Sequence, residues 1–191
     1  MDSKKERALA PVMSIPSRNA APEDILRSAR TFFATTKTSM GRRLLQSDRN
    51  AGLLIEVFRS LIAEKKFEMH DFVIMPDHIH LILTVHDGMT IEKAMQLIKG
   101  RYSFRIKKEL GMLGEVWQRG FSEVQVMNRQ SVEKHHEYIA ENPVKAGLVD
   151  SPEKYPYCYR SLAKLKVTSE MNSKGNIVAG TVQQGLKPAS I

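Results

Sequence analysis

The hydrophobic residues between positions 29 and 166 repeat with two different periods. Short runs rich in β-branched and aromatic residues predict strands, and apolar residues spaced three and four apart predict amphipathic helices. The strands are expected over residues 31–38, 68–75, 78–85 and 121–127, and the helices over residues 48–66, 90–110 and 131–142.

Local signals set the ends of these helices. Asp48, Thr90 and Ser131 are suitable N-cap residues, because their side-chain oxygens can accept hydrogen bonds from the free N–H groups of a first turn. Pro143 is expected to end the last helix near Asn142, because a proline disfavours helical geometry in the residue before it.

The order of the elements predicts the fold class. A tight turn at Pro76-Asp77 joins two strands into an antiparallel hairpin, and the full order is β-α-β-β-α-β-α. This order predicts an α+β fold of the ferredoxin-like split βαβ type, with an antiparallel sheet of four to five strands, helices on one face and a C-terminal helix that bears Tyr138. Residues 29–166 form the predicted domain, between a disordered leader (1–28) and a disordered tail (167–191).

The composition and charge of the chain indicate which kinds of partner it binds. The chain has 191 residues and a net charge of +8, with a pI near 9.6. This balance favours a polyanionic partner, most commonly nucleic acid, although an unspecialised basic surface would have the same charge. Cys158 is the single cysteine, which excludes a disulfide framework within one chain and a cysteine-based zinc site. No apolar run is long enough to span a membrane, which fits a cytoplasmic protein.

Two histidines stand two positions apart in the strand predicted over residues 78–85. Side chains in a strand repeat with a period of two, so His78 and His80 point to the same face of the sheet. Neutral imidazoles bind divalent metal ions well, and two of them suit an open catalytic site better than a closed structural one. The competing interpretation is a pair of ordinary histidines on a polar sheet face.

Tyr138 and Asn142 lie one turn apart, so their side chains share one face of the last predicted helix. A phenol can attack a phosphate from which a metal ion withdraws charge, and the product is a covalent phosphotyrosine. The amide oxygen of Asn142 is a candidate third metal ligand. In the alternative interpretation, Tyr138 is a packed amphipathic residue and Asn142 is a helix C-cap.

Basic residues gather after the first predicted strand, along the second predicted helix and before the last strand. Such side chains neutralise backbone phosphates without reading sequence, whereas a solvated helix face has the same composition. We take six of them as candidate nucleic-acid contacts: Arg42, Arg43, Lys99, Arg101, Arg105 and Arg119.

Together these residues predict a metal-dependent enzyme that cuts nucleic acid through Tyr138. Two other functions stay open. One is a catalytically inactive ferredoxin-like module that only binds nucleic acid. The other is a metal-dependent phosphodiesterase in which water attacks, so that no covalent protein–DNA adduct forms.

The sequence also resembles a known family. The segment MPDHIH at residues 75–80 resembles the HUH motif (histidine, hydrophobic residue, histidine), and YIAENPVKAG at residues 138–147 resembles the tyrosine helix of the REP-associated tyrosine transposases. The segments VWQRGF at residues 116–121 and YPY at residues 155–157 are similar to further landmarks of this family. The similarity covers roughly residues 29–165 in a consistent order.

The resemblance implies a ferredoxin-like endonuclease domain that uses Mg²⁺ or Mn²⁺. It makes His78 and His80 metal ligands, Asn142 the third ligand, and Tyr138 the nucleophile that attacks single-stranded DNA to form a 5′-phosphotyrosine and free a 3′-hydroxyl. The implied partners are single-stranded DNA hairpins of REP type beside a short guide tetranucleotide. A monomer is expected, although relatives from insertion sequences form homodimers. The leader and the tail depart from the family pattern, which leaves the details of hairpin recognition open.

Overall fold

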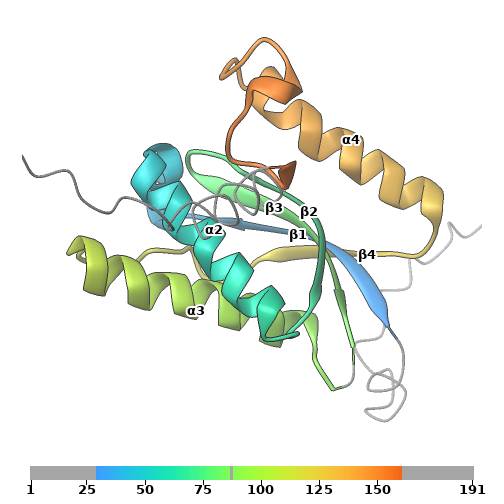
Figure 1. Cartoon of the computed structure of the whole chain (residues 1–191), viewed down its shortest axis with the longest axis horizontal. Helices are drawn as coiled ribbons and strands as arrows, with labels where there is room; N and C mark the ends of the chain where they lie inside the picture. Colours follow the sequence, from blue (N-terminus) through green and yellow to red (C-terminus); the bar gives the residue numbers. More distant parts are fainter. Residues whose placement is uncertain (1–28, 87, 161–191) are drawn as a thin grey trace, which may run out of the picture.

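The computed structural model describes residues 29–86 and 88–160. The predicted leader (1–28) and tail (167–191) lie outside these residues, as do residues 161–166 of the predicted domain. The described part of the chain is a sheet with helices on both faces (Figure 1).

Four strands form one antiparallel sheet in the order β2-β3-β1-β4. Each central strand is followed by a helix that crosses over the other central strand to reach an edge strand, which is the split βαβ arrangement expected from the sequence. The strands are β1 (Arg30–Lys37), β2 (Glu68–Ile74), β3 (His78–Val85) and β4 (Ser122–Val126).

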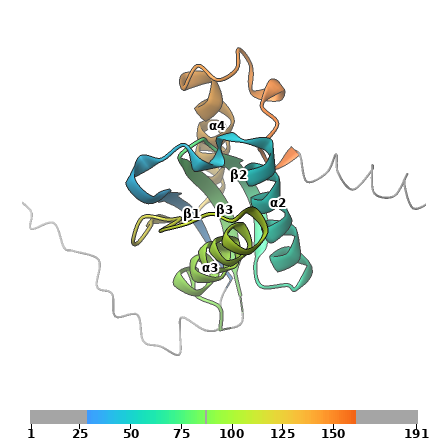
Figure 2. The same cartoon turned by 90° about the vertical axis from the view of Figure 1, so that its left-hand side faces the viewer.

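The helices divide between the two faces of the sheet. α2 (Asp48–Ala63) and α3 (Ile91–Leu110) cover one face, and α4 (Arg129–Lys145) lies on the other (Figure 1, Figure 2). This matches the predicted fold class, in which a separate C-terminal helix carries Tyr138. Because strand side chains alternate, β3 presents one set of residues to α2 and α3 and the other set to α4.

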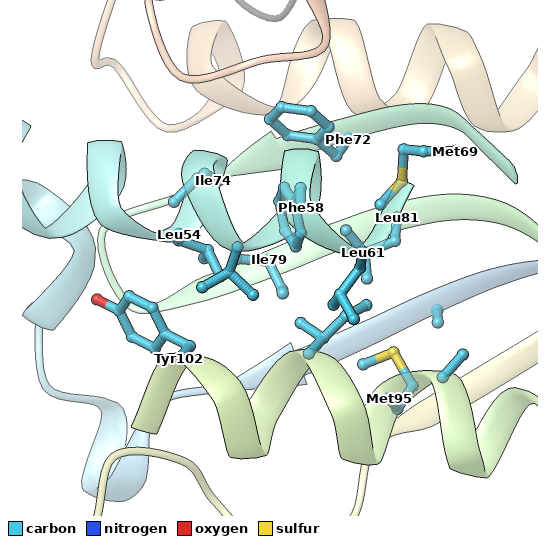
Figure 3. Packing of buried hydrophobic residues seen from close by; sticks show 14 of the residues in the cluster. Leu54, Phe58, Leu61, Met69, Phe72, Ile74, Ile79, Leu81, Met95 and Tyr102 are labelled. Atoms are coloured by element: carbon cyan, nitrogen blue, oxygen red, sulfur yellow. The ribbon is translucent and has the colours of Figure 1, made fainter. Parts of the chain in front are cut away.

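The main hydrophobic core lies between the sheet and the α2–α3 layer. Phe58 of α2 contacts Phe72 of β2 with a ring-centroid distance of 4.9 Å, and Figure 3 shows their neighbours from α2, α3 and the strands. The residues that α3 buries in this core are Ile91, Ala94, Met95, Ile98, Tyr102 and Ile106. This core fixes the sheet on which the second face is built.

A smaller core lies under α4. The helix itself buries only Ile139 and Pro143. After α4 the chain returns to β2, where the hydroxyl of Tyr155 donates to the carbonyl of Ile74 at 2.7 Å. The buried members of this cluster are Val73, Met75, Ile82, Ile139 and Tyr155. α4 is therefore held against the β2–β3 half of the sheet.

Two of the three predicted N-caps are wrong by one to three residues. Thr90 caps α3 as expected, but Ser47 caps α2 in place of Asp48, and Asn128 caps α4 in place of Ser131. Ser47 and Asn128 have the extended backbone that an N-cap needs, and their side-chain oxygens accept from N–H groups three residues later. Asp48 then lies in the first turn of α2, where its charge suits the helix dipole.

The predicted end of the last helix near Asn142 is also wrong, because α4 continues through Pro143 to Lys145. Proline removes one helical N–H donor, but the next turn is intact, since Ala146 N–H donates to the Asn142 carbonyl at 3.0 Å. The ring of Pro143 is buried, and this burial offsets the lost hydrogen bond. Asn142 consequently lies within the helix.

Candidate active site

His78, His80 and Tyr138 come together on the face of the sheet that α4 covers. The ring centroids of His78 and His80 lie 4.8 Å apart, and those of His80 and Tyr138 lie 5.1 Å apart. The two histidines come from central strand β3 and the tyrosine from α4. A rigid strand thus presents the imidazole pair directly to the helix that carries the phenol.

Phe33 of β1 packs beside this group. Its ring stacks on His80 at a centroid distance of 5.5 Å and meets the edge of Tyr138 at 5.8 Å. On its other side it contacts His135 of α4 at 4.4 Å. Because Phe33 touches both strand and helix residues of the site, it fixes the distance between them.

Hydrogen bonds orient both imidazole rings. The Nδ1 atom of His80 lies 2.7 Å from the hydroxyl of Thr35, and that of His78 lies 2.6 Å from a carboxylate oxygen of Asp77. The main chain of Asp77 is itself fixed, since its carbonyl accepts from the N–H of Thr38 at 2.8 Å. With Nδ1 engaged in each ring, Nε2 is the atom left to bind a cation.

His80 is in a state suited to a metal ligand. His80 is buried, and its buried Nε2 has no hydrogen-bond partner within residues 29–86 and 88–160. Burial lowers the pKa of His80 to about 3, with smaller contributions from the charges of His78 and Lys37. The ring is therefore neutral at ordinary pH, and its buried Nε2 is left without a partner in the described part of the chain.

Among residues 29–86 and 88–160, no group of three or more His, Cys, Asp or Glu side chains could hold a metal ion. His78 and His80 therefore supply two imidazoles and leave positions open for other ligands. Asn142 lies partly exposed one turn after Tyr138, on the same face of α4. The hydrogen bond described for Asn142 involves only its main-chain carbonyl. A ligand role for its side-chain amide is therefore part of the proposal below.

Three of the predicted nucleic-acid contacts lie on α3, across the sheet from the histidines. Arg101 pairs with Glu64 at 2.5 Å, and Arg105 bonds to Glu109 at 2.6 Å. The amino group of Lys99 donates to two main-chain carbonyls, and burial lowers its pKa. All three cations thus have partners within the protein, and a DNA contact would have to share or break these bonds.

The other three predicted contacts precede α2 or β4. Arg42 donates to the main-chain carbonyls of Ser39 and Glu115, and Arg43 donates to the side chain of Gln46 at 2.8 Å. Arg119 is exposed, and no described ion pair or side-chain hydrogen bond involves it. Of the six, Arg119 is the cation that the described part of the chain leaves most accessible to an anion.

Sequence reasoning missed three residues that shape the site: Phe33, Thr35 and Asp77. Asp77 adjoins His78 in sequence, so a short carboxylate next to a candidate ligand was an available signal. Thr35 meets His80 only because β1 pairs with β3 in a register that aligns these two residues. Phe33 contacts the site because α4 covers this face. Neither the register of β1 with β3 nor the face of the sheet that α4 covers can be predicted from the neighbouring residues in the sequence.

Thr35→Val is expected to weaken Mn²⁺ binding by about 10- to 100-fold, because it keeps the shape of the side chain and removes the partner of His80 Nδ1. Titration calorimetry measures this change. Thr31→Val is the matched control, since Thr31 lies on the same strand and bonds to Thr84, away from the histidines. Equal Mn²⁺ affinity in both variants would show that Thr35 does not orient a ligand.

Comparison with known proteins covers the same region. A family model described as Transposase IS200 like matches residues 35–142. A relative from Haemophilus influenzae, described as a REP-associated tyrosine transposase, is 30% identical over 103 residues, which are 48% of this chain and 57% of that protein. The REP-associated tyrosine transposase of Escherichia coli K12 is 28% identical over 133 residues, 69% of this chain and 70% of that protein.

The chain therefore spans little more than half of the Haemophilus influenzae relative. A solved structure of a REP-associated tyrosine transposase bound to a REP hairpin shares the fold, with a TM-score of 0.58 and 24% identity over 84% of this chain and 93% of that one. The family match includes the strand with the histidine pair and the helix with Tyr138, and it extends over more than half of the residues. This chain belongs to the IS200-like transposase family.

Proposed function

We propose that this chain cleaves and rejoins single-stranded DNA at REP-type hairpins, through a covalent 5′-phosphotyrosine on Tyr138. The observation that carries this proposal is the contact between the Tyr138 ring and His80, whose buried Nε2 has no partner among the residues that the structure describes. Family membership implies an enzyme that cuts and joins DNA. The hairpin substrate is inferred from the names of the relatives and from the hairpin bound in the structure that shares this fold.

In this proposal Tyr138 acts as the nucleophile. The residue is 44% exposed, which supports access of a DNA strand to it. In the proposed step the phenol oxygen loses its proton and bonds to phosphorus, while the bond from phosphorus to the 3′-oxygen breaks and the 3′-oxygen takes up a proton. The phosphodiester energy is kept in the phosphotyrosine, so a 3′-hydroxyl can reverse the attack and join strands.

His78, His80 and Asn142 would hold Mg²⁺ or Mn²⁺ in this proposal. Such an ion, when bound, withdraws charge from the phosphate under attack. Asp77 and Thr35 keep the two imidazoles oriented, and burial keeps His80 neutral. The buried Nε2 supports this assignment, because a polar atom without a partner costs stability unless a ligand satisfies it.

One chain supplies every residue of the proposed site. Tyr138 contacts the histidine of its own chain, and this contact supports our proposal of a monomer as the active form. None of the helices in the described ranges is long and apolar enough to cross a membrane. We place the activity in the cytoplasm, where the proposed DNA substrate is found.

The direct test incubates the full chain with labelled single-stranded hairpins and Mn²⁺, followed by denaturing electrophoresis. The proposal expects a labelled band shifted to the mass of the protein with its DNA, dependent on metal and absent with EDTA. Cleavage without a shifted band would favour attack by water. Binding without cleavage at any metal concentration would favour the inactive binding module.

A further inference from the structure

A pocket opens at the C-terminal end of β1, beside the candidate active site. Thr35 pairs with Ser122, and the N–H of Gln118 donates to the carbonyl of Lys37 at 2.9 Å. Between these two points, the segment from Gln118 to Ser122 leaves β1 and forms an outward loop. Gly120, with φ of +70°, allows this excursion. The pocket is lined by residues 35–37 of β1 and residues 118–122.

A residue of α3 holds this loop (residues 118–122) in place. The amino group of Lys99 donates to the carbonyls of Gln118 and Gly120, at 2.9 and 2.7 Å. The indole N–H of Trp117 donates back to the Lys99 carbonyl at 3.2 Å. Lys99, which the sequence suggested as a DNA contact, is thus a positioning residue for this loop. The pocket is consequently preformed in the free protein.

Two cations of this pocket are free to bind an anion. Lys37 and Arg119 are exposed, and no ion pair or side-chain hydrogen bond is found for either within the two described ranges. These two free cations are the complement of a phosphate group.

The pocket shares a wall with the metal-ligand pair. Thr35 lines the pocket and also bonds to His80 Nδ1 at 2.7 Å, and Lys37 lies opposite His78 in the register of β1 with β3. A strand with one phosphate at Tyr138 can therefore place a neighbouring phosphate here. We propose that Lys37 and Arg119 bind a backbone phosphate of the single-stranded DNA, next to the phosphate that is cleaved. This inference rests on the proposed function.

The first test compares Lys37→Ala/Arg119→Ala with Lys107→Ala/Lys108→Ala, which removes the same charge from the last turn of α3. Both are made in a Tyr138→Phe background so that the DNA stays intact, and binding to a hairpin with a single-stranded extension is measured against salt. The pocket variant should lower the slope of log K against log salt by about 0.7 for each lost contact with single-stranded DNA. The control should leave the slope close to that of the parent.

A neutral methylphosphonate, substituted in turn for each phosphate of the single-stranded extension, locates the phosphate that the pocket binds. One position close to the cleavage site should weaken binding to the parent by about tenfold and have no further effect on the pocket variant. Two results would overturn the assignment. The first is a slope of log K against log salt that falls equally in both double variants. The second is a methylphosphonate effect that is the same in the parent and the pocket variant at every position. A wild type that forms no covalent adduct would reject the proposed function without changing this binding result.

Discussion

Tyr138→Phe is expected to bind hairpin DNA within about threefold of the wild-type affinity and to form about 10⁴-fold less covalent adduct, or none. Phenylalanine keeps the ring contacts with His80 and Phe33 and removes only the oxygen that attacks phosphorus. The fold should be unaffected, because the described hydrogen bonds do not involve that oxygen. Denaturing electrophoresis measures the adduct, and a gel-shift titration measures binding.

Tyr159→Phe is the matched control for this prediction. Tyr159 is also an exposed tyrosine, at 39%, and its ring contacts Phe72 at the edge of β2, not the histidines. The control should form adduct at the wild-type rate. Equal adduct formation by Tyr138→Phe would reject Tyr138 as the nucleophile, whereas cleavage without adduct in both proteins would indicate attack by water.

The elements with strong local signals were the ones that could be predicted from sequence. β3 has the expected bounds 78–85, and α3 runs from the expected cap Thr90 to Leu110, because alternation, a capping threonine and a following glycine act within a few residues. The end of α4 could not be predicted in this way. The preference against helix before Pro143 is local and weak, and burial of the proline ring, which depends on the tertiary fold, overrides it.

The same distinction between local and non-local signals applies to the candidate site. The shared face of His78 and His80 follows from strand periodicity alone, and the shared face of Tyr138 and Asn142 follows from helix periodicity. The contact between Tyr138 and His80 depends on which face α4 covers, and the bond from Thr35 to His80 depends on the strand register. Arg101 pairs with Glu64, the C-cap of α2, and Arg105 pairs with Glu56 of α2. These partners are equally distant in sequence, so a count of charges could not separate paired cations from free ones.

His80→Ala and His78→Ala are expected to reduce metal-dependent cleavage by about 10³-fold or more while retaining most of the DNA affinity, because backbone contacts supply most of the binding. Each variant removes one of two imidazoles, and the remaining one cannot hold a divalent ion alone at the proposed site. His80 is buried, so its truncation also leaves a cavity. The side chain of His78 is 21% exposed, so His78→Ala tests metal binding with a smaller effect on packing.

A thermal readout separates loss of metal from loss of fold. Mn²⁺ at about 100 times its dissociation constant should stabilise the wild type by about 2.7 kcal/mol, which corresponds to a rise in melting temperature of roughly 5–10 °C for a chain of this size. EDTA should reverse this rise, and both histidine variants should lack it even where their metal-free melting temperature is close to that of the wild type. His86→Ala, which alters a histidine beyond the end of β3 beside Glu68, should keep the full response. If His80→Ala still gains stability from Mn²⁺ and still cleaves, the histidine pair does not bind the metal, and the unpartnered Nε2 of His80 needs a different ligand.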